Sequence, residues 1–264
     1  MTCREVEAEI IPYASGAAIP QEAAAHIAGC NRCLRLVRAI QETQPVVPPS
    51  GEQLKRIEAP ILADLKPVRP LVSGSALFFA LMCVVAAVVA VGAAGFGNAG
   101  WQALGPLQRT AVFTVLATAA CLLASSAGRQ IVPGSELLLP PYLLVTAVLA
   151  VVTGIVATLF RPLHESTFVS TGLVCLRIGL ECAIPAAFLL WLLLRRGATL
   201  NPMLTGATTG ALAGLSGLTV LEIFCPNLNE YHILVWHVGA SMASAIGGTA
   251  IGMIADYSGS RRFR

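Results

Sequence analysis

Three residues of types that commonly bind metal ions lie close together near the start of the sequence. His26, Cys30 and Cys33 form the pattern H-x3-C-x2-C within HIAGCNRC, and Cys3 is the only other cysteine or histidine before residue 83. Thiolate sulfur and imidazole nitrogen suit structural zinc, which usually takes four protein ligands in tetrahedral geometry. The sequence therefore predicts one structural zinc ion bound by Cys3, His26, Cys30 and Cys33.

The local helix pattern supports this prediction. The stretch PQEAAAHIAGC is typical of a helix with Pro20 in its first turn, which places His26 and Cys30 on one face. Gly29 helps to end that helix, so that Cys33 can approach from the next turn. A domain of about 40 residues has too little core of its own, and a metal cross-link would stabilise it. The alternative is two small buried cysteines beside a surface histidine. The sequence contains no H-E-x-x-H pattern of the kind that marks a catalytic zinc site, so a structural metal is the prediction.

Most of the remaining sequence is apolar. Apolar residues make up 56% of the chain, charged residues only 12%, and the mean hydropathy is +0.75, which is typical of a bilayer protein. About 20 helical residues cross the hydrocarbon core. Transmembrane helices are predicted at about 71–95, 107–127, 139–160, 172–194, 203–224 and 233–254. Small residues recur at every fourth position from Gly206 to Gly214 and from Ala240 to Gly252, which predicts close packing of the last two spans.

Basic residues predict the orientation of these six spans. One side carries ten of the flanking lysines and arginines, and the other side carries only Arg109 and Arg161. The ten are Lys55, Arg56, Lys66, Arg69, Arg129, Arg195, Arg196, Arg261, Arg262 and Arg264. The positive-inside rule places both termini in the cytoplasm. In that reducing compartment, clustered cysteines favour metal binding over a disulfide.

The N-terminal segment then resembles a known family. CREVEAEIIPYASGAAIPQEAAAHIAGCNRCLRLVRAI is similar to the zinc-binding anti-sigma factor domain of bacteria, of the zinc-finger type, over residues 2–40. The shared pattern is an early cysteine, a Y-x-x-G turn at Tyr13 and Gly16, a helix, and H-x3-C-x2-C. The resemblance implies that the domain binds a sigma factor of the extracytoplasmic-function (ECF) group and keeps it from RNA polymerase. It also implies Cys3, His26, Cys30 and Cys33 as the zinc ligands.

A short amphipathic helix is predicted between the zinc site and the first span. Its apolar residues recur at helical spacing, with charged residues largely on the other face. Those apolar residues are Leu54, Ile57, Ile61, Leu62 and Leu65. Pro60 predicts a bend or a restart. The apolar face suits a groove on the sigma factor; the alternative is a helix resting on the membrane surface or on the zinc domain.

The membrane part resembles a second family, the six-span negative regulators of sigma F, over roughly residues 65–254. CLRIGLECAIPAAFLLWLLLRRGA and FCPNLNEYHILVWHVG carry the likeness. The resemblance implies that Cys175 and Cys225, near the outer face, read an external redox or metal signal. A disulfide with Cys225 could be formed by Cys175 or, alternatively, by Cys182. The other interpretation is that all three cysteines are small residues that only pack between helices.

Few ionisable residues lie within the predicted spans. Arg177 and Glu181 are spaced to form an intramembrane ion pair along one helix. Glu222 and Asp256 fall near span ends, where we expect water to reach them. His232 and His237 are five residues apart, a poor match to one helical face. The sequence therefore favours interfacial polar residues over a second metal site formed by Cys225, Glu230, His232 and His237.

Together these features predict an all-α protein with four segments: a zinc-binding domain at 1–44, a linker with an amphipathic helix at 45–70, six transmembrane helices at 71–256, and a basic tail at 257–264. The predicted function is a membrane-embedded anti-sigma factor of the bacterial inner membrane, without enzymatic activity. Its partners would be an ECF-type sigma factor and membrane lipid, with no direct nucleic-acid contact. Oligomeric state is left open, homo-oligomers included. The alternative is a small transporter or membrane enzyme with a regulatory zinc domain, which predicts carboxylates or histidines in facing spans.

Overall fold

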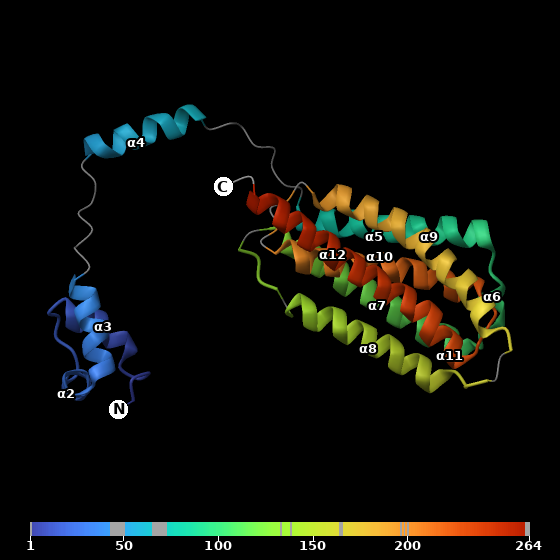
Figure 1. Ribbon diagram of the computed structural model, residues 1–264, viewed down its shortest axis with the longest axis horizontal. Helices are drawn as coiled ribbons and strands as arrows, with labels where there is room; N and C mark the ends of the chain where they lie inside the picture. Colours follow the sequence, from blue (N-terminus) through green and yellow to red (C-terminus); the bar gives the residue numbers. More distant parts are fainter. Residues whose placement is uncertain are drawn as a thin grey trace. The chain divides into compact units, whose positions relative to one another are not determined.

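The computed structural model describes residues 2–42, 51–64, 73–132, 134–137, 139–163, 166–195, 197, 199 and 201–261. The described residues form helices and no extended strand, as the sequence predicts (Figure 1). The chain divides into two compact units, Met1–Val68 and Arg69–Arg264. Each unit has its own buried core.

The first unit is a small cluster of helices. A 3-10 turn η1 (Glu7–Glu9) leads into α1 (Ile10–Ala14), followed by α2 (Gln21–Gly29) and α3 (Asn31–Glu42). Gly16 has a φ of +79°, which lets the chain turn back after α1 at little steric cost. Among the described residues of this unit, the buried core is formed by Val6, Ile10, Ala23, Ile27, Cys33 and Val37. A core of this size offers little stability by itself.

Helix α4 (Gly51–Asp64) carries the amphipathic pattern of the linker. It continues through Pro60 as one helix, so Pro60 does not restart the helix. An exposed proline near the end of a short helix loses one hydrogen bond without displacing a packed neighbour. The described apolar side chains Leu54, Ile57 and Leu62 are more than half exposed, whereas Leu65 and the side chain of Ile61 lie outside the described residues.

The second unit holds six long helices that run side by side (Figure 1). They are α5 (Gly74–Phe96), α7 (Pro106–Gln130), α8 (Pro141–Leu159), α9 (Phe168–Leu194), α10 (Pro202–Phe224) and, after α11 (Glu230–His232) and the π-helical turn η2 (Ile233–Val238), α12 (Gly239–Arg261). Short α6 (Ala99–Ala103) precedes α7. All six are long and apolar enough to cross a membrane, which confirms the predicted number of spans.

Helix α10 is the buried centre of this bundle. In its most apolar 18-residue stretch, 78% of the residues are buried, against 28–44% in the corresponding stretches of the other five long helices. Its mean hydropathy of 1.4 is nevertheless the lowest of the six. A helix that faces protein on all sides does not need the hydrophobicity that lipid contact demands. A methyl group on Gly206 would overlap the carbonyl of Gly248, and one on Gly210 would overlap that of Ser244. The small residues therefore bring α10 and α12 into backbone contact, as their spacing predicts.

Candidate metal centres

The four predicted zinc ligands converge in the first unit. One ligand atom from each of Cys3, His26, Cys30 and Cys33 lies within 4.8 Å of the other three. Cys3 comes from the N-terminal turn, His26 from the last turn of α2, and the two other cysteines flank the start of α3. The two sulfurs of Cys3 and Cys30 are 3.6 Å apart. The cluster therefore joins the chain start to the turn between α2 and α3.

The surroundings of these four residues suit a cation. Nε2 of His26 is buried and has no hydrogen-bond partner among the described residues, which leaves it available as a ligand. Backbone N–H groups of Cys33 and Arg32 and the Cys3 thiol lower the pKa of the Cys30 thiol to about 6, which favours the thiolate that binds metal. Burial, followed by the neighbouring thiols, raises the pKa of Cys33. Three sulfurs and one nitrogen could hold one metal ion.

A second cluster lies in the membrane unit, formed by Cys175, Cys225, His232 and His237. One ligand atom from each residue lies within 4.8 Å of the other three, and all four residues are buried. The two sulfurs are 3.5 Å apart. Nε2 of His232 is 3.4 Å from the Cys175 sulfur and 3.7 Å from the Cys225 sulfur. The cluster is close to the end of α10 and the start of α9.

The structure distinguishes the two cysteines that the sequence left as alternatives. Cys175 lies beside Cys225, whereas Cys182 is two turns further along α9, where a methyl group on Gly92 of α5 would be 3.4 Å from its sulfur. Cys182 is buried by helix packing. The two membrane cysteines that meet are therefore Cys175 and Cys225. The two cysteines are not joined by a disulfide bond in the structure.

The expectation that His232 and His237 diverge is wrong. It assumed an α-helix, in which residues five apart point in different directions. The chain instead forms a π-helical turn at Ile233–Val238, whose hydrogen bonds join residues five apart. The wider turn brings His232 and His237 to one side, with ring centroids 5.3 Å apart. Sequence periodicity missed this pair because the local helix type was not readable from it.

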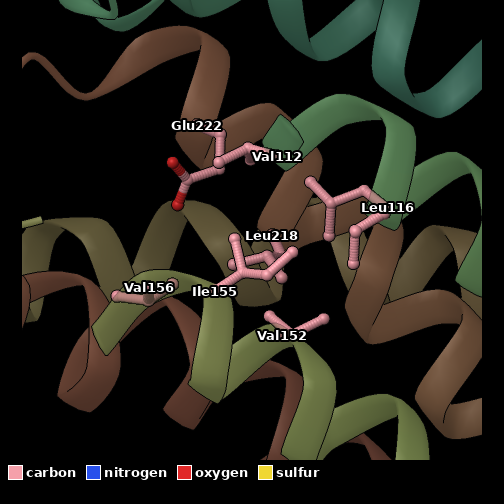
Figure 2. Close-up of a pocket in the computed structure, with 8 residues that line it drawn as sticks. Val112, Leu116, Val152, Ile155, Val156, Leu218 and Glu222 are labelled. Atoms are coloured by element: carbon pink, nitrogen blue, oxygen red, sulfur yellow. The ribbon is translucent and has the colours of Figure 1, made fainter. Parts of the chain in front are cut away.

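Glu222 is also not where the sequence placed it. It is 5% exposed instead of water-accessible, because α10 runs through the centre of the bundle and its last turn stays inside it. Figure 2 shows Glu222 among the residues that line one small pocket, together with aliphatic side chains that include Val112, Val156 and Leu218. Its Oε1 lies 2.8 Å from Nδ1 of His237. The imidazole thus satisfies a buried carboxylate that would otherwise be costly to desolvate.

The remaining predicted residues lie on the outside of their helices. Arg177 donates from Nε to Oε1 of Glu181 at 2.6 Å, and both side chains point out of the bundle with 77% and 45% exposure. Asp256 is exposed near the end of α12. Glu230 is not part of the described metal-competent clusters.

The family model described as "negative regulator of sigma F" matches residues 62–255, which covers more than half of the chain. The match covers α5 to α10 completely and α12 up to residue 255, and it leaves the N-terminal cluster outside it. Neither the curated proteins nor the solved structures contain a match to the sequence.

Proposed function

Because the chain belongs to the negative regulator of sigma F family, we propose that it is a membrane-embedded anti-sigma factor for a sigma factor of the ECF group. It would sequester the sigma factor at the cytoplasmic face of the bacterial inner membrane and release it when a signal reaches the membrane unit. No covalent chemistry is needed, since release requires only a state with lower affinity for sigma. The observation that carries the proposal is a family match over the six-helix unit in a chain that begins with a Cys/His cluster.

The N-terminal unit is the proposed sigma-binding part. The residues present fit one structural zinc ion, and we assign Cys3, His26, Cys30 and Cys33 as its ligands. When bound, zinc would supply a cross-link between segments that share a core of only six buried residues. The chain start, α2 and α3 would then present one fixed surface to the partner.

Helix α4 would form the second part of the sigma-binding surface. Leu54, Ile57 and Leu62 leave an apolar stripe exposed, while Glu52 and Arg56 pair at 3.3 Å on the helix surface. An amphipathic helix of this kind binds by placing its apolar side chains into a groove on a partner. We include Ile61 and Leu65 in the same stripe on the basis of their spacing.

The distribution of basic residues supports cytoplasmic termini for this arrangement. Ten flanking lysines and arginines fall on the side that holds both termini, against two on the other side. The N-terminal unit would then face the compartment that contains RNA polymerase and the sigma factor. Cys225 and the start of α9 would lie toward the outer face.

One observation bears on the rival function of a transporter or membrane enzyme. Glu222 and His237 are a carboxylate and a histidine on facing spans, which that rival predicts. The two residues contact each other, His237 belongs to the Cys/His cluster, and the cavity beside Glu222 measures about 10 Å³. A cavity of that size holds one water molecule at most. The Glu222–His237 pair is therefore better explained as part of a fixed local site than as part of a path for a transported substrate.

Co-purification tests the proposal. The full chain in detergent would be mixed with the ECF sigma factor encoded beside its gene, and the complex measured by light scattering together with its zinc content. We expect a one-to-one complex. The double variant Cys30→Ser/Cys33→Ser should lose sigma binding and contain one zinc ion fewer. Cys83→Ser, at an exposed cysteine outside both clusters, is the matched control and should keep both. A wild-type chain that leaves sigma unbound would refute the proposal.

A further inference from the structure

We propose that Cys175, Cys225, His232 and His237 form a second metal site, for a thiolate- and imidazole-preferring ion such as Zn²⁺ or Cu⁺, and that Glu222 positions His237 in it. The donor set has two sulfurs and two nitrogens. Hard cations such as Mg²⁺ and Ca²⁺ prefer oxygen ligands, so this set selects softer ions.

The spacing of the donor atoms matches tetrahedral coordination. Metal–sulfur bonds of about 2.3 Å and metal–nitrogen bonds of about 2.0 Å, set at tetrahedral angles, place ligand atoms roughly 3.3–3.8 Å apart. The measured separations are 3.5 Å between the two sulfurs, and 3.4 and 3.7 Å from His232 Nε2 to the sulfurs of Cys175 and Cys225. The three donors with measured separations therefore already lie at the distances that one ion would require.

His237 is oriented as a fourth ligand by Glu222. Its Nδ1 faces the carboxylate at 2.8 Å, which leaves Nε2 as the nitrogen available to a metal. That Nε2 is buried and has no hydrogen-bond partner among the described residues. Metal-binding histidines usually donate their second N–H to a carboxylate or carbonyl, which fixes the tautomer and the ring plane. Glu222 supplies that contact from α10.

The cluster is also enclosed in the way that a permanent site would be. The rings of Phe168 and Trp236 lie 5.6 Å apart, and Phe168 meets the edge of His232 at 6.4 Å between centroids. Gly172 makes room for the Trp236 ring, because a methyl group there would overlap it. Gly100 of α6 makes room for the backbone of Cys225, since its methyl would lie 2.9 Å from the Cys225 nitrogen. Excluding water from the ligands strengthens their hold on a cation.

The site would connect three elements. Cys175 belongs to α9, Cys225 follows α10, and both histidines belong to the turn that begins the last span. A bound ion would therefore hold these three elements in one fixed arrangement.

The metal site is tested apart from sigma in the full-length variant Cys30→Ser/Cys33→Ser in detergent, which keeps only the second cluster intact. Co²⁺ is the spectroscopic probe for the Zn²⁺ site, and Cu⁺ is titrated separately against a chelator of known affinity. We expect one equivalent bound and a sulfur-to-cobalt charge-transfer band. Adding Cys175→Ser/Cys225→Ser should abolish both. Absence of the band and of tight Zn²⁺ or Cu⁺ binding from the parent variant would overturn the proposal.

Two matched variants separate the ligands from general packing. Cys182→Ser changes a buried cysteine on the same helix outside the cluster and should bind as the parent does. Glu222→Gln keeps the size and one hydrogen-bond acceptor, and should weaken Zn²⁺ binding roughly 10- to 100-fold, the usual effect of removing such a supporting carboxylate. Circular dichroism and gel filtration would show that each variant is folded. Unchanged affinity in folded Glu222→Gln would refute its positioning role.

Discussion

The two metal-competent clusters of this protein are built in different ways. In the N-terminal unit, three of the four ligands lie within eight residues, and the pattern is legible in the sequence. In the membrane unit, the ligands come from α9, the end of α10 and the turn before α12, and Cys175 is 50 residues from Cys225. The first cluster sits in a unit with a minimal core, and the second inside a large packed bundle. If both clusters bind metal as proposed, similar ligand sets serve folding in one unit and tie packed helices together in the other.

Removing metal from both clusters should produce the largest difference between the two units. A strong chelator is expected to unfold the N-terminal unit, because its six buried residues cannot offset the entropy of ordering the chain. The six-helix unit should keep its helices. Hydrogen exchange followed by mass spectrometry would check this, with amides of α2 and α3 losing protection and those of α10 retaining it. Equal loss in both units would contradict the contrast.

A bulky residue at the α10–α12 contact should destabilise only the membrane unit. Gly210→Leu places a side chain against the Ser244 backbone, where neither helix can yield without separating. We expect a loss of about 3 kcal/mol or more, the upper range for overpacking of a core. Thermal unfolding in detergent would measure it. Gly154→Leu, at a helical glycine with open space around it, is the control and should have little effect.

Removing the buried carboxylate should have an intermediate effect. Glu222→Leu leaves His237 Nδ1 buried without its partner, which costs about 1–3 kcal/mol in the metal-free protein. Glu222→Gln restores an acceptor and should recover most of that stability. Thermal unfolding of both variants after chelation would show whether the polar contact or only the side-chain volume matters. If Leu and Gln destabilise equally, the hydrogen bond is not what stabilises this position.

A substitution at the Trp236 contact should change metal binding by the second cluster only. Gly172→Ala pushes a methyl group into the indole ring, which would shift the aromatic side chains that enclose the second cluster. We expect weaker Co²⁺ binding by that cluster and none of this effect at the N-terminal one. Metal titration of the Gly172→Ala variant in the Cys30→Ser/Cys33→Ser and Cys175→Ser/Cys225→Ser backgrounds separates the two sites. A change at the N-terminal site would contradict the independence of the units.

The smallest effect is expected at the exposed ion pair. Arg177→Ala/Glu181→Ala removes a contact between neighbouring turns of one helix, with both side chains directed out of the bundle. Replacing both partners by apolar residues leaves neither charge unpaired in the membrane, so the net change in stability should be small. Thermal unfolding and metal content should therefore match the wild type. A marked loss of stability would show that the pair has a partner in the membrane, such as a second copy of the chain.

The sequence by itself determined the features that depend on local composition and spacing. Long apolar runs predicted six membrane helices because each must satisfy its backbone within itself, and H-x3-C-x2-C predicted a cluster because its ligands share one turn region. Only the tertiary structure decided that α10 lies at the centre, that Glu222 is buried against His237, and that Cys175 and not Cys182 meets Cys225. Those outcomes depend on which faces of different helices meet and on one π-helical turn. The hydrophobic periodicity of a single segment predicts neither of them.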